Sequence, residues 1–233
     1  MTPAAPVLGV DGCRAGWVGV VLGPGPLVRG VFGADIGAVV QAAVAGAGDL
    51  GAIGVDMPLH LSPDGHRLCD LAARSHLGAK GASLFVTPPE PALRAASYGE
   101  ACAVARRLTG KAPSLQAWAL RAKVLELDAW WPAAPYPVHE VHPEVSFSLM
   151  VGVPIAARKA SWAGLAARRA ALAAEGVVVP DDIGPAGRLA GADDVLDAAA
   201  VAWTARRIHA GAARPFPDPP VEVPGGRRQA IWA

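Results

Sequence analysis

The stretch that decides the fold is Val7-Leu-Gly-Val-Asp11-Gly-Cys-Arg-Ala-Gly-Trp17, which continues into Val18-Gly-Val-Val-Leu22. Its apolar run predicts a short strand that ends by presenting the carboxylate of Asp11. Gly12 and Gly16 allow the chain to turn back at once into a second strand, as in a hairpin. A carboxylate at the end of a buried strand costs desolvation free energy unless a cation or a hydrogen-bond network receives it. Asp11 is therefore the first candidate functional residue.

The pattern that follows predicts an α/β fold with a mixed sheet. β-Rich runs at 7–10, 17–22 and 27–32 are separated by glycines and prolines, which indicates a three-stranded antiparallel meander. Asp35 precedes an alanine- and valine-rich stretch and is expected to cap its helix. The next apolar run, Ala52-Ile-Gly-Val-Asp56-Met-Pro58, follows that helix, so it should lie parallel to the first strand. Gly-Val-Asp thus occurs twice at strand ends, where open α/β sheets bind ligands.

The remaining chain predicts one domain, 1–233, with a mostly helical insertion at about 60–131 that includes helices at 98–108 and 114–130. A strand is expected at 137–141, and alternation places Glu140 and His142 on one of its faces. Late helices are expected at 161–174 and 192–210. The second of these helices begins with Asp193 and Asp194, where the helix dipole favours negative charge, and Asp193 is the preferred N-cap. The proline-rich tail from Arg214 is expected to be extended.

Carboxylates from these elements form the candidate site. If the sheet gathers them, their repulsion is tolerable mainly when some are protonated or when divalent cations neutralise them. Oxygen ligands favour Mg²⁺ or Mn²⁺, and two such ions can activate a water and support the leaving oxygen of a phosphodiester. Taken singly, each acid also has an ordinary structural interpretation, such as a turn acceptor, a helix cap or a solvent-facing strand residue. The candidate catalytic residues and metal ligands are Asp11, Asp56, Glu140, Asp194 and Asp197.

Composition narrows the class of protein. The formal net charge is +1 and the isoelectric point is near 7.8, so the chain lacks the large excess of positive charge that is typical of a dedicated nucleic-acid-binding protein. The cysteines Cys13, Cys69 and Cys102 form no Cys-x-x-Cys pair, which argues against a disulfide framework and favours a reducing compartment. Neither a signal peptide nor an apolar run long enough for a membrane span is evident. We expect a cytoplasmic protein that does not act at a membrane; its oligomeric state is left open.

Basic residues outnumber acidic residues by nine to six in the predicted insertion. A solvated helical surface is the ordinary interpretation, and a basic rim that faces a substrate is the alternative. His139 and His142 have no third ligand nearby in sequence, so zinc is not expected, and Cys13 is expected to be a packing residue. The basic residues are Arg67, Arg74, Lys80, Arg94, Arg106, Arg107, Lys111, Arg121 and Lys123.

The order of strand-Asp, meander, helix, strand-Asp, strand-Glu and helix-Asp-x-x-Asp-Ala resembles the ribonuclease-H-like fold. Asp194-Val-Leu-Asp197-Ala resembles the last motif of the Holliday-junction resolvases of that fold. More specifically, the chain resembles a domain-of-unknown-function family, number four-two-nine, described as predicted ribonuclease-H-like nucleases. The matching pieces are Gly9-Val-Asp-Gly-Cys-Arg-Ala-Gly-Trp17, Val55-Asp-Met-Pro58, Arg67-x-x-Asp70-x-x-Ala-Arg74, Phe85-x-x-Pro88, Glu140-Val-His-Pro-Glu144 and Asp193-Asp-x-x-Asp197-Ala.

The resemblance implies that Asp11, Asp56 and Asp197 are metal ligands, with Glu140 or Asp194 completing the set. Asp56 stands where the resolvases commonly have Glu, and its shorter side chain would change the metal spacing. Other recurrent polar positions of the family are candidates for substrate binding: Arg14, Arg67, Arg74, His142, Glu144 and Lys159.

The first functional hypothesis is a nuclease or phosphodiesterase that uses two Mg²⁺ or Mn²⁺ ions on a nucleic acid or a small phosphoester. The second is a nucleotide-binding protein related to the actin-like group, because Asp11-Gly-x-x-x-Gly faintly resembles a phosphate loop. The third is a binding module that keeps the fold without catalysis. Cation-dependent cleavage, nucleotide-dependent stabilisation and metal titration distinguish the three.

Overall fold

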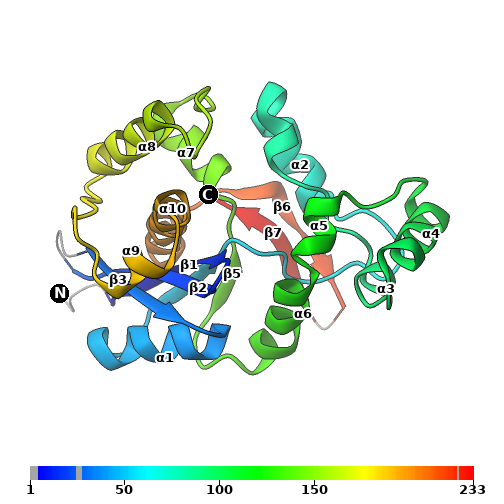
Figure 1. Cartoon of the computed structure of the whole chain (residues 1–233), viewed down its shortest axis with the longest axis horizontal. Helices are drawn as coiled ribbons and strands as arrows, with labels where there is room; N and C mark the ends of the chain where they lie inside the picture. The colour runs from blue at the N-terminus through cyan, green and yellow to red at the C-terminus, as the bar shows by residue number, and fades with distance from the viewer. Residues whose placement is uncertain (1–4, 25–27, 225) are drawn as a thin grey trace. The chain divides into compact units, whose positions relative to one another are not determined.

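The opening stretch forms the centre of a five-stranded sheet in the computed structural model (Figure 1). Strands β1 (Val7–Cys13), β2 (Gly16–Leu22) and β3 (Val28–Gly33) pair antiparallel as a meander. Strand β4 (Ala52–Val55) lies parallel to β1, and β5 (Val138–Glu140) lies parallel to β4, so the order is β3-β2-β1-β4-β5. The predicted α/β class with a mixed sheet is confirmed, and the arrangement is consistent with a ribonuclease-H-like fold.

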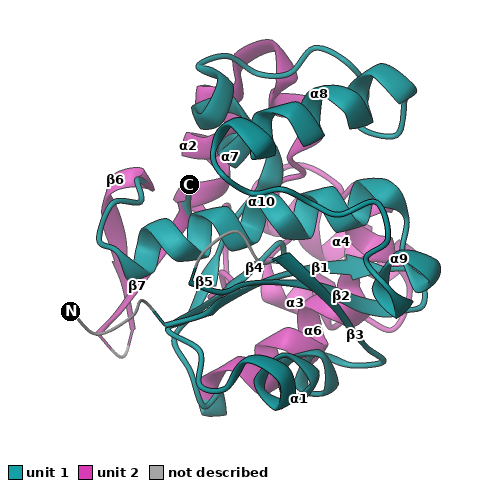
Figure 2. Ribbon diagram, turned by 90° about the vertical axis from the view of Figure 1, so that its left-hand side faces the viewer, with its two compact units in different colours: residues 1–57, 133–214, 232–233 teal, residues 58–132, 215–231 magenta. Residues whose placement is uncertain are grey.

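The structure describes residues 5–24, 28–224 and 226–233, and the chain divides into two compact units. The first unit comprises 1–57, 133–214 and 232–233, and it contains the five-stranded sheet; the second comprises 58–132 and 215–231 (Figure 2). The first residue of the third predicted strand run, Leu27, lies outside the described residues. That the whole chain acts as one domain stays a prediction.

Helices cover both faces of the sheet in the first unit (Figure 2). On one face, α1 (Ile36–Ala47) begins at Asp35, whose side chain accepts a hydrogen bond from the backbone N–H of Ala38 at 2.7 Å, as the cap prediction requires. On the other face lies α10 (Ala192–His209), which contacts β1, β2 and β4. It is joined by α7 (Pro143–Val151), α8 (Trp162–Ala174) and α9 (Pro185–Leu189).

Glycine and alanine residues allow α10 to lie directly on the sheet. A Cβ atom at Gly9 would lie 2.1 Å from the backbone nitrogen of Ala202 and 2.3 Å from the carbonyl oxygen of Ala198. Such distances leave no room for any side chain at residue 9. Because β1 and α10 touch backbone to backbone, acids on the two elements can come close together.

One local prediction for the first unit needs correction, and one helix of this unit was not predicted. The N-cap of α10 is Gly191 rather than Asp193, and the side chain of Asp194 accepts a hydrogen bond from the backbone N–H of Gly191 at 3.1 Å. The carboxylate of Asp194, in the first turn, therefore accepts a hydrogen bond from the N-cap backbone N–H, as in a capping box. In addition, the chain after Glu140 continues from Pro143 into α7, which the motif Glu140–Glu144 did not reveal; proline is well suited to a first helical position.

The second unit is mostly helical, with a two-stranded sheet. Helix α4 (Tyr98–Thr109) agrees with the expected 98–108, whereas the stretch expected as one helix at 114–130 divides at Leu120. The tail from Arg214 is extended, as expected, and forms a two-stranded sheet. The remaining elements are α2 (Leu68–Leu77), η1 (Gly78–Ser83), α3 (Glu90–Leu93), α5 (Leu115–Ala119), α6 (Arg121–Trp130), η2 (Trp131–Ala133), β6 (Pro215–Val223) and β7 (Arg227–Trp232).

Candidate metal centre

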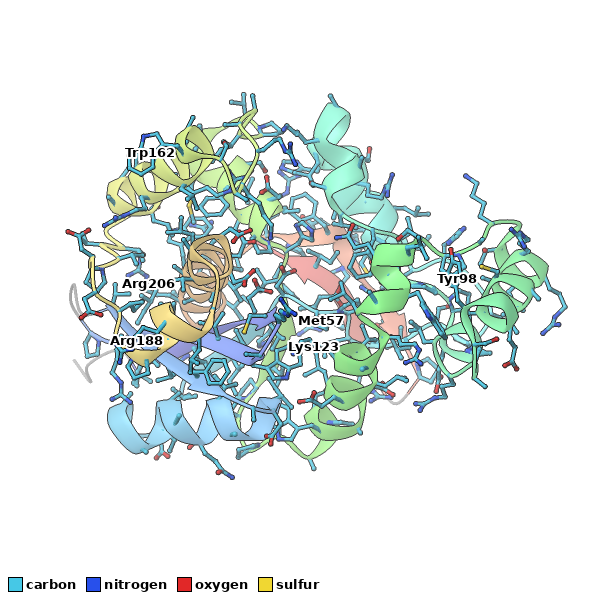
Figure 3. All side chains as sticks on the ribbon, in the orientation of Figure 1. Met57, Tyr98, Lys123, Trp162, Arg188 and Arg206 are labelled. Carbon is cyan, nitrogen blue, oxygen red and sulfur yellow. The ribbon has the colours of Figure 1, made fainter. Side chains whose placement is uncertain are left out.

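Three carboxylates meet at the carboxyl ends of β1 and β4. Asp11 lies near the end of β1, Asp56 follows β4 directly, and Asp197 comes from the second turn of α10. One oxygen of each side chain lies within 4.8 Å of the others, and we call these residues the acid trio. Figure 3 labels Met57, the residue after Asp56, near these strand ends. The structure thus brings together three of the five predicted metal ligands.

The register of the sheet explains why the first two acids are adjacent. β1 and β4 are parallel neighbours with Val10 opposite Val55, so the next residue of each strand emerges at the same edge. The backbone N–H of Asp56 also donates to the carbonyl oxygen of Val10 at 2.9 Å. The repeated Gly-Val-Asp sequence therefore produces a repeated structural position.

Burial and mutual repulsion raise the pKa of all three carboxyl groups. The pKa of Asp11 lies well above its ordinary value because the group is buried and faces the charges of Asp56 and Asp197. The pKa of Asp56 is also well above its ordinary value, by burial first and then by the charge of Asp197. Burial raises the pKa of Asp197 to about 6. The trio is therefore a site where a cation would relieve unfavourable negative charge.

The amino group of Lys159 partly neutralises this charge. Its Nζ donates to Oδ2 of Asp197 at 2.7 Å and lies 3.9 Å from Oδ2 of Asp193, and its side chain is about half exposed. Burial lowers the pKa of Lys159, but the charge and hydrogen bond of Asp197 and the charge of Asp11 outweigh it and raise the pKa above its ordinary value. Lys159 therefore remains an ammonium ion in contact with the trio.

The other oxygen of Asp197 is available to a ligand. Oδ1 is buried and has no hydrogen-bond partner among the described residues, while the whole residue is 2% exposed. A buried carboxylate oxygen left without a donor costs free energy. This oxygen, together with the carboxylate donor set of the trio, fits a hard divalent cation such as Mg²⁺ or Mn²⁺.

A buried ion pair holds the segment that carries Lys159. Arg168, which is 1% exposed, donates through Nη2 to Oε1 of Glu144 on α7. Its Nη1 donates to the carbonyl oxygen of Gly164 at 3.2 Å and to that of Ala157 at 3.4 Å. Arg168 thus ties Ala157, which precedes Lys159, to α8. Sequence reasoning missed Arg168, because an arginine in an alanine-rich helix reads as solvent-exposed.

Glu140 and Asp194, the other two predicted ligands, flank the trio. Glu140 lies at the end of β5, is buried, and contributes its charge to the raised pKa of Asp56. The pKa of Asp194 is raised by its own burial, and one oxygen of Asp194 is used in the cap of α10. Both residues are near enough to act on the trio electrostatically.

The predicted substrate-binding residues of the first unit divide by exposure. Arg14 lies exposed in the turn between β1 and β2. His142 lies at the start of α7 with its Nδ1 buried and without a hydrogen-bond partner among the described residues. Burial lowers the pKa of His142 to about 4, and the positive charge of Lys159 adds to this effect. His142 is therefore neutral at physiological pH. The carboxylate of Glu144 forms the buried ion pair with Arg168.

The remaining two, Arg67 and Arg74, belong to the second unit and bond within it. Arg67 is fully buried, lies 3.0 Å from Oδ1 of Asp70, and donates to the carbonyl oxygen of Leu59 at 3.0 Å. Arg74 donates to the carbonyl oxygen of Leu84 at 2.7 Å. These contacts hold backbone segments of the second unit in place.

Residues 9–222 match the family model described as "Protein of unknown function (DUF429)". The chain belongs to this family. The DUF429 match extends over parts of both compact units and includes the three acids of the trio. Searches among curated proteins and among solved structures found no match. Within the part of the chain that the structure describes, no helix is long and apolar enough to cross a membrane.

Proposed function

We propose that this DUF429 protein is a metal-dependent nuclease that hydrolyses a phosphodiester bond of a nucleic acid. The observation that carries the proposal is the acid trio, in which Asp11, Asp56 and Asp197 place carboxylate oxygens within 4.8 Å of one another. The raised pKa of each acid supports a cation as the natural partner of the trio, as does Oδ1 of Asp197, which accepts no hydrogen bond from the residues that the structure describes.

The trio would hold the first of two Mg²⁺ or Mn²⁺ ions, and Glu140 and Asp194 are proposed to complete the set for the second. When bound, such ions supply a hydroxide at neutral pH and stabilise the negative charge on the leaving 3′ oxygen. The protein residues orient the site: β1 and β4 fix Asp11 and Asp56, and the packing of α10 on the sheet fixes Asp197.

Cationic side chains near the trio are proposed to contact the phosphates. Lys159 is half exposed and already bonded to Asp197, so its amino group lies where a phosphate beside the trio would need a donor. Arg14 is exposed in the turn that follows Asp11. His142 is neutral at physiological pH, so its imidazole can donate a hydrogen bond to the substrate or accept one from it without adding charge.

Cleavage assays in Mn²⁺ test the proposal directly. The purified protein should cleave labelled single-stranded or double-stranded DNA or RNA in Mn²⁺ but not in EDTA, and Asp11→Asn should abolish the cleavage. Asp64→Asn is the matched control, because Asp64 is exposed in the second unit and is not one of the three acids of the trio. Cleavage by a folded Asp11→Asn protein at the rate of the unaltered protein would contradict the assignment.

The actin-like alternative has less support from the local geometry. β1 and β2 remain paired as far as Cys13 opposite Gly16, so the segment between Asp11 and Trp17 is a tight hairpin turn rather than an open phosphate loop. Nucleotide should therefore produce no thermal stabilisation beyond that of Mg²⁺ alone. A catalytically silent module would instead show no stabilisation by Mn²⁺ alone.

Cytoplasmic location is part of the proposal, and the free cysteines Cys13, Cys69 and Cys102 support it.

A further inference from the structure

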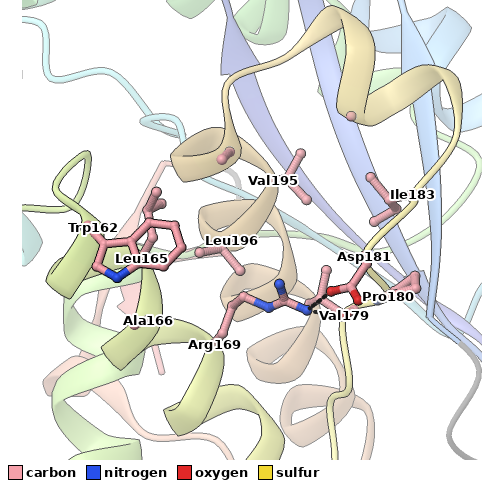
Figure 4. A pocket seen from close by; sticks show the side chains of 12 residues that line it. Trp162, Leu165, Ala166, Arg169, Val179, Pro180, Asp181, Ile183, Val195 and Leu196 are labelled. Carbon is pink, nitrogen blue, oxygen red and sulfur yellow. Dashed lines mark hydrogen bonds and ion pairs between the residues drawn. The ribbon is translucent and has the colours of Figure 1, made fainter.

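A pocket of about 380 Å³ lies in the first unit, between α8, α9, α10 and the segment that joins α8 to α9 (Figure 4). This volume falls within the range of small-molecule binding sites in proteins. The pocket is lined mainly by apolar side chains, among them Trp162, Leu165, Val179, Ile183, Val195 and Leu196. We call it the Trp162 pocket.

Trp162 leaves a large aromatic surface open to a ligand. It is the first residue of α8 and is 88% exposed, although tryptophan is among the side chains that bury the most apolar area. Figure 4 shows its indole ring beside Leu165 at the edge of the pocket. A flat aromatic face next to apolar walls suits a planar heterocycle, which stacks on one side and is enclosed on the other.

Polar groups across the pocket complement the edge of such a ring. Nη2 of Arg169 lies 2.8 Å from Oδ1 of Asp181 and donates to the carbonyl oxygen of Val179 at 3.0 Å (Figure 4). The guanidinium offers donors and the carboxylate offers acceptors, which are the groups that recognise nucleobase edges. Both side chains are exposed enough to change partners.

The pocket lies beside the acid trio along α10. Leu196 lines the pocket, and the next residue, Asp197, belongs to the trio. Lys159, which contacts Asp197, precedes Trp162 by three residues. The two sites therefore lie on adjacent faces of the first turns of one helix, and the diameter of a helix is only about 10 Å.

We propose that the Trp162 pocket binds an unpaired nucleobase of the substrate strand, which makes single-stranded nucleic acid the preferred substrate. This inference rests on the proposed nuclease function, because the phosphate beside the bound base is the one that reaches the trio. In an intact duplex the base faces are stacked on their neighbours and do not reach a protein pocket unless the base is flipped out. The pocket recognises the base, so DNA and RNA strands are both suitable ligands.

Binding without cleavage tests the pocket. Fluorescence anisotropy in EDTA would compare a short labelled single strand, as DNA and as RNA, with an abasic strand of the same length and charge. The unaltered protein should bind the base-containing strand about tenfold more tightly than the abasic strand, as expected for one stacked base. Trp162→Ala should remove this difference, and Trp162→Phe should restore much of it.

The matched control is Leu115→Ala, which removes an apolar side chain that is 69% exposed in the second unit; it should keep the preference for bases. Equal binding of the two strands by the unaltered protein, or an unchanged preference in Trp162→Ala, would overturn the proposal. So would a change from dimer to monomer in Trp162→Ala, measured by sedimentation, because the pocket would then cover a second copy of the chain.

The two proposals can fail separately. Base-dependent binding without any Asp11-dependent cleavage would remove the nuclease assignment and leave the pocket as a nucleic-acid-binding site. Asp11-dependent cleavage without base-dependent binding would remove the pocket proposal and leave the nuclease assignment.

Discussion

Nζ of Lys159 lies 2.7 Å from Oδ2 of Asp197, so a protein cation already occupies one side of the acid trio. A divalent cation that binds Asp197 competes with this ammonium for the same carboxylate. The contact therefore has two effects of opposite sign: it stabilises the metal-free protein and it opposes the entry of metal. These effects can be separated by mutation.

Lys159→Met should lower the melting temperature of the metal-free protein and increase the stabilisation produced by Mn²⁺. Without the ammonium, the buried charge of Asp197 loses its hydrogen-bonded partner, and the divalent cation loses its competitor. Thermal unfolding in EDTA and in a series of Mn²⁺ concentrations measures both effects. Arg158→Met is the control, since Arg158 is the exposed neighbour of Lys159. An unchanged Mn²⁺ midpoint in Lys159→Met would refute the competition.

The metal-free protein should lose stability as the pH rises from about 4 to about 6. The pKa of Asp197 is raised from 3.8 to about 6 by burial, so the folded state binds more protons than the unfolded state in this window. The contribution is complete below the unfolded pKa and is lost as the pH passes the folded pKa; a shift of about two units sets an upper limit of about 3 kcal/mol. Asp11 and Asp56 act in the same direction.

Urea unfolding of metal-free protein at several pH values measures this dependence, and comparison with Asp197→Asn isolates the contribution of one acid. The variant should show a smaller loss between pH 4 and 6. Asp181→Asn is the control, because Asp181 has a side chain that is 93% exposed. Parallel pH profiles for Asp197→Asn and the unaltered protein would show that folding does not raise the pKa of Asp197.

The parts of the fold that could be predicted are those with a local signal. β-Rich apolar runs separated by glycines and prolines indicate the meander. The helix between Asp35 and Asp56 indicates a crossover connection, so the strand before Asp56 lies parallel to the first strand. The repeated Gly-Val-Asp then places Asp11 and Asp56 at one edge. Asp197 is a candidate from its place near the start of a late helix, but no local pattern reveals that α10 packs directly on β1 and so brings Asp197 to the same edge.

The parts that could not be predicted depend on tertiary contacts. Asp193 and Asp194 are equally good caps by residue type, and only the structure shows that the acid of Asp194 turns back to Gly191. The Trp162 pocket is assembled from α8, the short α9 and α10, and no local pattern in their sequences brings these elements together. Arg168 and Arg169 are chemically identical neighbours, yet one is buried and the other exposed, because successive residues point to different sides of a helix.

Arg168→Met should destabilise the protein by about 3–5 kcal/mol, since it leaves the buried carboxylate of Glu144 without its partner. It should also weaken Mn²⁺-dependent cleavage, because the segment with Lys159 loses the hydrogen bond that Arg168 donates to the carbonyl oxygen of Ala157. Chemical denaturation and the cleavage assay measure the two effects. The double variant Glu144→Gln with Arg168→Met should recover part of the stability, because no buried charge is left unpaired.

Arg169→Met provides a control from the same helix turn. Its ion pair with Asp181 is exposed, and exposed pairs contribute about 0–1 kcal/mol. Equal losses of stability in Arg168→Met and Arg169→Met would contradict the role assigned to the buried pair.

Gly9→Ala should cost about 3 kcal/mol or more and abolish Mn²⁺ binding even where the protein still folds. The added methyl group would lie 2.1 Å from the backbone nitrogen of Ala202, and a helix backbone cannot yield as a flexible side chain does. Relief requires α10 to move away from β1, which separates Asp197 from Asp11. Gly23→Ala is the control, since no described residue other than its chain neighbours lies within 4 Å of its added methyl group. Urea unfolding and Mn²⁺-dependent thermal shift would measure both losses; a stable Gly9→Ala protein that keeps its Mn²⁺ response would show that the close packing of β1 on α10 is not what assembles the trio.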